Sequence, residues 1–81
     1  MSNVTYYVAM GFERDEQGDL VAMDPVECHS STQATSRARS LAATKAGAIA
    51  FSRTGDPMLG EFSDAVVLWQ GGEVPSDALN A

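Results

Sequence analysis

The residues best suited to bind a ligand form the run Arg53-Thr54-Gly55-Asp56-Pro57. This run combines a cation, a hydroxyl, a flexible glycine and a carboxylate that is held in place by the following proline. Such a combination can bind an anion or a small molecule, so we predict Arg53, Thr54 and Asp56 as ligand-binding residues. The spacing matches no phosphate-binding loop, because neither Gly-x-x-x-x-Gly-Lys nor Gly-x-Gly-x-x-Gly occurs.

A structural explanation competes with binding at the same residues. A carboxylate before a proline commonly caps a turn, which would account for Asp56. Arg53 would then pair with Glu61 or Asp64. We favour this structural explanation and keep the binding loop as the alternative.

Cys28-His29 is the only neighbouring pair of side chains that could act in catalysis. A cysteine just before a helix can be reactive. Adjacent residues on a strand point to opposite faces, however, so His29 is poorly placed to act as a base for Cys28. One cysteine, one histidine and scattered carboxylates also form no metal-ligand spacing. We therefore predict no catalytic residue, no metal site, no cofactor and no enzymatic activity.

The charged residues are arranged in three blocks along the chain. The central block, residues 28–55, has four of the five cations and no acid, whereas the segments on either side are acidic. The net charge of −6 argues against binding to nucleic acid or to an anionic membrane. We expect the central cations to pair with the acidic segments, and an anionic partner is the alternative.

Alternating apolar residues predict a strand from Val4 to Glu13, and a turn follows in which Gly18 supplies a positive φ. A return strand spans residues 20–28 and completes a β-hairpin. Its Asp24-Pro25 pair predicts an edge, a bulge or a break, because proline cannot donate a hydrogen bond to the neighbouring strand.

Ser30 to Ala46 has the pattern of an amphipathic helix with a mostly alanine face, which must lie close to its sheet. Ser30 and Gln33 have capping-box spacing, and Gly47 fits the left-handed position after the last turn. The free amides at the helix N-terminus could add to an anion site. Residues 48–53 and 65–70 are the remaining predicted strands, joined by a long structured loop.

These elements predict one α+β domain of ββαββ order, with a four-stranded, mainly antiparallel sheet and one helix packed on one face. The domain spans residues 1–72, and residues 73–81 form a flexible acidic C-terminal tail. Several strands are apolar on both faces, and one helix covers only one of them. We therefore predict a homodimer, whose interface residues are Tyr7, Val66, Leu68 and Trp69.

The run Ala46-Gly47-Ala48-Ile49-Ala50-Phe51-Ser52-Arg53-Thr54-Gly55-Asp56-Pro57, with Gly60-Glu61-Phe62 and Asp64-Ala65-Val66-Val67-Leu68, resembles a family of short uncharacterised bacterial proteins. That family is commonest in α-proteobacteria, and the resemblance covers most of the chain. It implies a small bacterial cytoplasmic protein, and it implies no activity and no site residue.

The sequence as a whole predicts a cytoplasmic protein, because it has no signal peptide, no apolar run long enough for a membrane span and only one cysteine. The first functional hypothesis is a small non-enzymatic protein-interaction or regulatory module that acts as a homodimer or binds an unidentified protein partner. The alternative is a small-molecule or anion-binding domain that uses the Arg53–Asp56 loop and the helix N-terminus.

Overall fold

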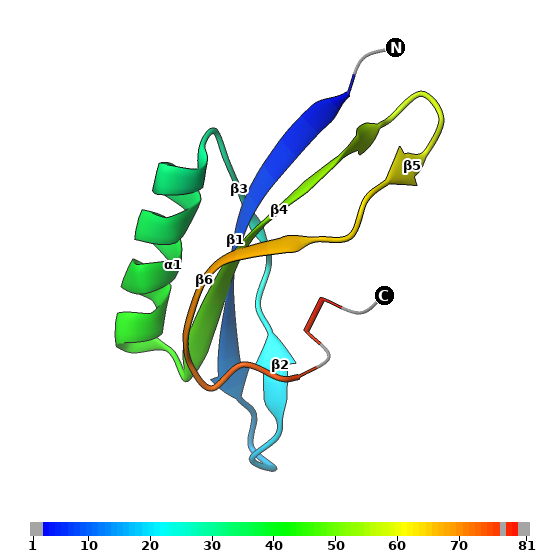
Figure 1. Ribbon diagram of the computed structural model, residues 1–81. Helices are drawn as coiled ribbons and strands as arrows, with labels where there is room; N and C mark the ends of the chain where they lie inside the picture. The colour runs from blue at the N-terminus through cyan, green and yellow to red at the C-terminus, as the bar shows by residue number, and fades with distance from the viewer. Residues whose placement is uncertain (1–2, 77, 80–81) are drawn as a thin grey trace.

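The computed structural model describes residues 3–76 and 78–79, and the described chain forms one helix and one antiparallel sheet (Figure 1). The fold is α+β, as predicted. The described residues form six strands, however, instead of the four that the predicted ββαββ order requires. In chain order, the elements are β1 (Val4–Arg14), β2 (Leu20–Ala22), β3 (Val26–Cys28), α1 (Ser31–Thr44), β4 (Gly47–Asp56), β5 (Glu61–Phe62) and β6 (Val66–Gly72).

The two additional strands have local causes. The predicted return strand is divided into β2 and β3, which both pair with β1, and the break between them contains Asp24-Pro25. This break is one of the outcomes predicted for Asp24-Pro25, because proline cannot donate a hydrogen bond to the neighbouring strand. The predicted loop after β4 contains β5, whose two residues pair with Gly55 and Asp56 at the end of β4.

The sheet is centred on β1 and β4, which pair from Val4 opposite Gly55 to Phe12 opposite Gly47. β2 and β3 lie along the other edge of β1, and β5 and β6 lie along the other edge of β4. The register between β4 and β6 shifts at Ala50/Phe51. This irregularity allows both Leu68 and Trp69 to pack against the core on the helix side.

The helix packs on one face of the sheet (Figure 1). The contact is made through alanine residues. Ala34 and Ala38 of α1 are fully buried, as are Ala9 of β1 and Ala48 and Ala50 of β4. Small side chains on both elements let the helix approach the sheet closely, as the alanine face predicts.

The Ser30 cap of α1 is confirmed, whereas the Gln33 side chain accepts from the residue before the cap instead of from Ser30 itself. The Gln33 backbone N–H donates to Ser30 Oγ at 3.1 Å, and the His29 backbone N–H donates to Gln33 Oε1 at 2.6 Å. The predicted helix end is wrong, because α1 ends at Thr44 and Lys45 caps it through its backbone N–H to the Leu41 carbonyl. Gly47 is the first residue of β4 and has no positive φ.

The face of the sheet that is turned away from α1 is called the second face. At one end of this face, Phe12 and Ile49 are each only 2% exposed. Val74 and Pro75, which follow β6, line a hollow together with Ile49 and Val67. Part of the second face is therefore covered by the protein's own C-terminal segment (residues 73–76 and 78–79), where the sequence predicts a second copy. The flexibility of that segment stays a prediction.

The chain enters the second face at Gly72. This glycine has φ +69°, and a Cβ atom there would lie 2.5 Å from the Ala46 carbonyl oxygen. The next backbone N–H, that of Glu73, donates to the same carbonyl at 2.9 Å. Only glycine accommodates both the left-handed backbone and the close approach.

Candidate functional site

The predicted binding residues lie in a strand and do not form one site. Arg53, Thr54 and Asp56 belong to the last four residues of β4, because pairing with β1 and then with β5 extends the strand beyond its predicted end. Side chains alternate along a strand. Arg53 therefore faces the second face, whereas Thr54 faces the helix side, where its Oγ1 lies 2.8 Å from Thr5 Oγ1.

Asp56 has the structural role that the sequence favours. It is only 8% exposed, and its Oδ1 accepts a hydrogen bond from the Met58 backbone N–H at 2.9 Å. Its carbonyl oxygen accepts from the N–H groups of Leu59 and Gly60 at 3.1 and 2.9 Å. Asp56 thus fixes the backbone of the turn that follows β4.

The turn lies at the end of a projection that we call the arm, formed by residues 3–6 and 53–66. β3 ends opposite Tyr7, so the earlier residues of β1 extend past β3 and α1 (Figure 1). The rings of Tyr6 and Phe62 contact each other on the arm with their centroids 5.9 Å apart.

Large apolar side chains are exposed on the arm. Met58 is 91% exposed, Leu59 68% and Val66 59%. Sequence reasoning missed Met58 and Leu59, although two adjacent large apolar residues between Pro57 and Gly60 were an available signal. Two adjacent exposed apolar side chains, Met58 and Leu59, indicate an interaction surface at the tip of the arm.

A pocket of about 300 Å³ lies on the second face beside the arm. Among the described residues that line it, Arg53 is the one cation, and the others are Tyr6, Val8, Met10, Phe51, Ala78 and Leu79. The Arg53 side chain is partly exposed, but its Nε atom is buried and has no hydrogen-bond partner among the described residues. Among the described residues, Arg53 also makes no ion pair with Glu61 or Asp64, so this part of the structural explanation is not found.

Three of the four predicted interface residues pack inside the protein. Tyr7, Leu68 and Trp69 are partly buried against the alanine core on the helix side. Arg39 of α1 lies over the Trp69 ring, 5.9 Å from its centroid, at cation–π distance. Val66 is exposed and belongs to the arm.

Cys28 and His29 are separated by burial. Cys28 is 7% exposed within the alanine core, and its Sγ lies 3.6 Å from the Val26 carbonyl oxygen. His29 is exposed. Within residues 3–76 and 78–79, no three His, Cys, Asp or Glu side chains approach each other closely enough to hold a metal ion.

The outer face of α1 carries shallow hollows lined mainly by hydroxyl groups, with Arg37 or Arg39 beside them. Ser30, at the predicted anion site, already uses its hydroxyl to accept the Gln33 N–H. Arg53 lines a pocket on the second face, so it does not share a face of the sheet with α1.

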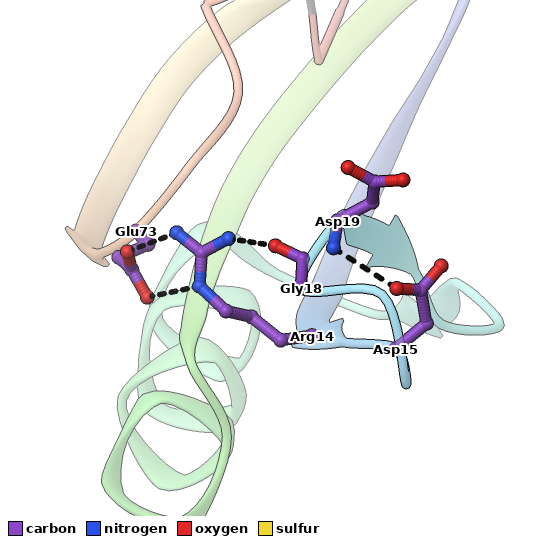
Figure 2. A network of polar contacts seen from close by, with 5 residues as sticks. All are labelled: Arg14, Asp15, Gly18, Asp19 and Glu73. Carbon is purple, nitrogen blue, oxygen red and sulfur yellow. Dashed lines mark hydrogen bonds and ion pairs between the residues drawn. The ribbon is translucent and has the colours of Figure 1, made fainter.

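A network of polar contacts holds the C-terminal segment to the first hairpin (Figure 2). Arg14 contacts Glu73 through Nη2–Oε1 at 2.5 Å and Nε–Oε2 at 3.3 Å, and it also donates to the Gly18 carbonyl in the hairpin turn. Hydrogen bonding and the charge of Arg14 lower the pKa of Glu73, and the same contact raises the pKa of Arg14.

The central cations pair in part with the acidic segments, as expected. Lys45 Nζ lies 3.1 Å from Glu13 Oε1, which links the end of α1 to the first hairpin. In the described part of the chain, the Arg14–Glu73 and Lys45–Glu13 pairs both join segments that are far apart in the sequence.

No protein-family model, curated protein or solved structure that was compared with the chain matches it. The resemblance to the bacterial family therefore stays a prediction. Among the described residues, no helix has both the length and the apolar character needed to cross a membrane.

Proposed function

We propose that the protein is a small non-enzymatic protein-interaction module that acts as a cytoplasmic homodimer through its arm. One observation carries this proposal: Met58 and Leu59 are exposed on a turn whose backbone is fixed by Asp56. An ordered turn loses little conformational freedom on binding, and burial of its apolar side chains contributes a favourable free energy of binding.

A second copy is the preferred partner for two reasons. Closed twofold dimers are the commonest soluble oligomers, and they join the same patch on both copies. Met58 and Leu59 are adjacent and exposed at the tip of the arm, so a twofold contact between two copies can bury both pairs of side chains.

Light scattering after gel filtration tests the proposal. The wild-type protein is expected to have about twice the monomer mass of 8.6 kDa. The double variant Met58→Ser, Leu59→Ser is expected to be monomeric with an unchanged circular dichroism spectrum, because neither side chain is buried in the monomer. Val21→Ser, at an exposed apolar residue of β2, is the matched control and should remain dimeric. A monomeric wild type would contradict the proposal, and so would a double variant that remains dimeric.

A second candidate function is the binding of a small anion at Arg53. The buried Nε without a partner favours it, because an unsatisfied buried donor costs about 1–3 kcal/mol and a bound acceptor removes this cost. Acetate titration followed by NMR is the direct test. Amide shifts around Tyr6 and Phe51 should saturate in the wild type and be absent in Arg53→Met.

A further inference from the structure

We propose that the pocket at Arg53 binds a small monocarboxylate with an apolar body, such as a medium-chain fatty acid. This inference rests on the second candidate function and adds the class of ligand. Tyr6 and Arg53 lie at the base of the arm, but the inference does not depend on Met58 and Leu59 at its tip or on the oligomeric state.

The charge at the pocket selects a carboxylate. Arg53 is the only cation among the lining residues, and its buried Nε–H needs an acceptor. The planar guanidinium matches a carboxylate with two parallel hydrogen bonds, and these bonds are strongest where water is excluded. A phosphate dianion would need several donors, which the mostly apolar lining does not supply.

The walls of the pocket select an apolar body. Tyr6, Val8 and Met10 of β1 and Phe51 of β4 form one side, and Ala78 and Leu79 form the other. The volume of about 300 Å³ lies at the lower end of the range of ligand pockets, roughly 300–1,000 Å³. It corresponds to about ten water-sized volumes, which suits a carboxylate with a chain of about eight carbons.

The C-terminal segment forms one wall of this pocket, so the segment has a role in binding. Its path onto the second face is fixed by Gly72 and by the backbone hydrogen bond of Glu73 to Ala46. The side chain of Glu73 is held in addition by Arg14 (Figure 2). Sheet and segment together line an open groove for the apolar body.

Octanoate is the probe, and the full chain is used throughout. Two-dimensional NMR of the backbone amides gives both the affinity and the location of binding. Octanoate is expected to bind saturably, with shifts at Tyr6, Phe51 and Leu79. Arg53→Met should weaken octanoate binding by about tenfold or more, because a hydrogen bond to a charged group is lost. Arg37→Met, at an exposed cation on α1, is the matched control and should bind like the wild type.

Two further probes separate this inference from the second candidate function. Octanol keeps the apolar body and removes the charge, and acetate keeps the charge and removes the body. Both are expected to bind more weakly than octanoate. If acetate binds as tightly as octanoate and its binding depends on Arg53, the anion-binding function is supported and the inferred preference for an apolar body is wrong. If Arg53→Met binds octanoate like the wild type, both are wrong.

The chain itself supplies a competing carboxylate in Asp77, which precedes Ala78 in the sequence and lies outside the described residues. Asp77→Asn tests this competitor. Binding of octanoate by the wild type and by Asp77→Asn with similar affinity supports an external ligand. Binding that occurs only in Asp77→Asn would overturn the proposal, because the partner of Arg53 would then belong to the same chain.

Discussion

At the scale of single residues, the placement of Arg53 is the unusual feature of this protein. A guanidinium is seldom buried without a partner, because the loss of hydration must be compensated by hydrogen bonds or an opposite charge. Here the side chain is partly exposed, but its Nε is buried beside apolar side chains and has no hydrogen-bond partner in the described part of the chain. Binding sites often retain such destabilising groups because the ligand needs them.

Arg53→Met is therefore expected to stabilise the protein without ligand. Methionine fills similar space with no buried donor, so the free energy of unfolding should rise by about 1 kcal/mol. Urea unfolding followed by circular dichroism measures the change, and Arg37→Met should leave stability unaltered. A lower stability for Arg53→Met would mean that the guanidinium makes a stabilising contact in the free protein.

Cys28 is expected to behave as a buried apolar residue. Its 7% exposure within the alanine core should make the reaction with a thiol reagent slow in the native protein and fast in denaturant. Absorbance of the released chromophore from a disulfide reagent measures both rates. Rapid labelling under native conditions would contradict this expectation and would support a redox role for this thiol.

At the scale of elements, the crossing from β6 to the second face depends on backbone geometry at Gly72. Gly60 provides a comparison within the same protein. Both glycines have φ +69°, but a Cβ at Gly60 would meet nothing within 4 Å, whereas at Gly72 it would meet the Ala46 carbonyl. A substitution at Gly60 therefore tests the cost of the left-handed backbone alone, and one at Gly72 tests that cost together with the close contact.

Gly60→Ala is expected to lower the free energy of unfolding by about 1 kcal/mol, the cost of a left-handed residue with a Cβ. Gly72→Ala should lower it clearly more, because the methyl group displaces the C-terminal segment as well. Urea unfolding of both variants makes the comparison. Equal losses would show that the close approach at Gly72 is easily relieved.

The Arg14–Glu73 contact gives the attachment of the C-terminal segment a pH dependence. The pKa of Glu73 is lowered in the folded protein from its ordinary value of 4.5, mainly by the hydrogen bond from Arg14. The contact therefore contributes stability above the unfolded-state pKa, and this contribution is lost as the pH falls through the folded-state pKa. Arg14 stays charged throughout this range.

Glu73→Gln is expected to be less stable than the wild type near neutral pH and equally stable in acid, once Glu73 is protonated. High salt should reduce the difference at neutral pH, because both side chains are exposed to solvent. Urea unfolding at several pH values and two salt concentrations provides the test. A stability difference that persists in acid would have to come from packing and not from the charge of Glu73.

At the scale of the whole molecule, the arm makes the protein elongated (Figure 1). The principal extents are 45 × 24 × 17 Å, and the Cα radius of gyration is 13.1 Å. A compact domain of this length would have a radius of gyration of about 12 Å. The additional length lies in a projection that exposes apolar side chains, as expected for a surface that is completed by association.

The dimer is expected to resist salt. Salt screens charges over about 10 Å at 0.1 M and has little effect on apolar burial, which Met58 and Leu59 would supply. The mass from light scattering should therefore be the same at low and high salt. Dissociation at high salt would contradict this expectation and would indicate an interface of charged residues, such as the cations on the outer face of α1.

Features that depend on near neighbours could be predicted from the sequence. The turn at Gly18, the cap at Ser30 and the turn at Asp56 each arise from hydrogen bonds within a few residues. The alanine face of α1 predicted a close helix–sheet contact in the same way, since helical spacing alone places Ala34 and Ala38 together. These local features explain why the α+β class was correct.

Features that depend on distant partners could not be predicted in this way. The role of Gly47 follows from its pairing with Gly72, and the neighbours of Arg53 follow from its pairing with Tyr6 of β1. The pocket requires Leu79 to return to a face formed by β1. Turns and helices form through hydrogen bonds and spacings between residues that are close in the sequence. Only the tertiary structure brings residues from separate segments side by side. The candidate site depends on that placement, because its charge and its apolar walls come from segments far apart in the chain.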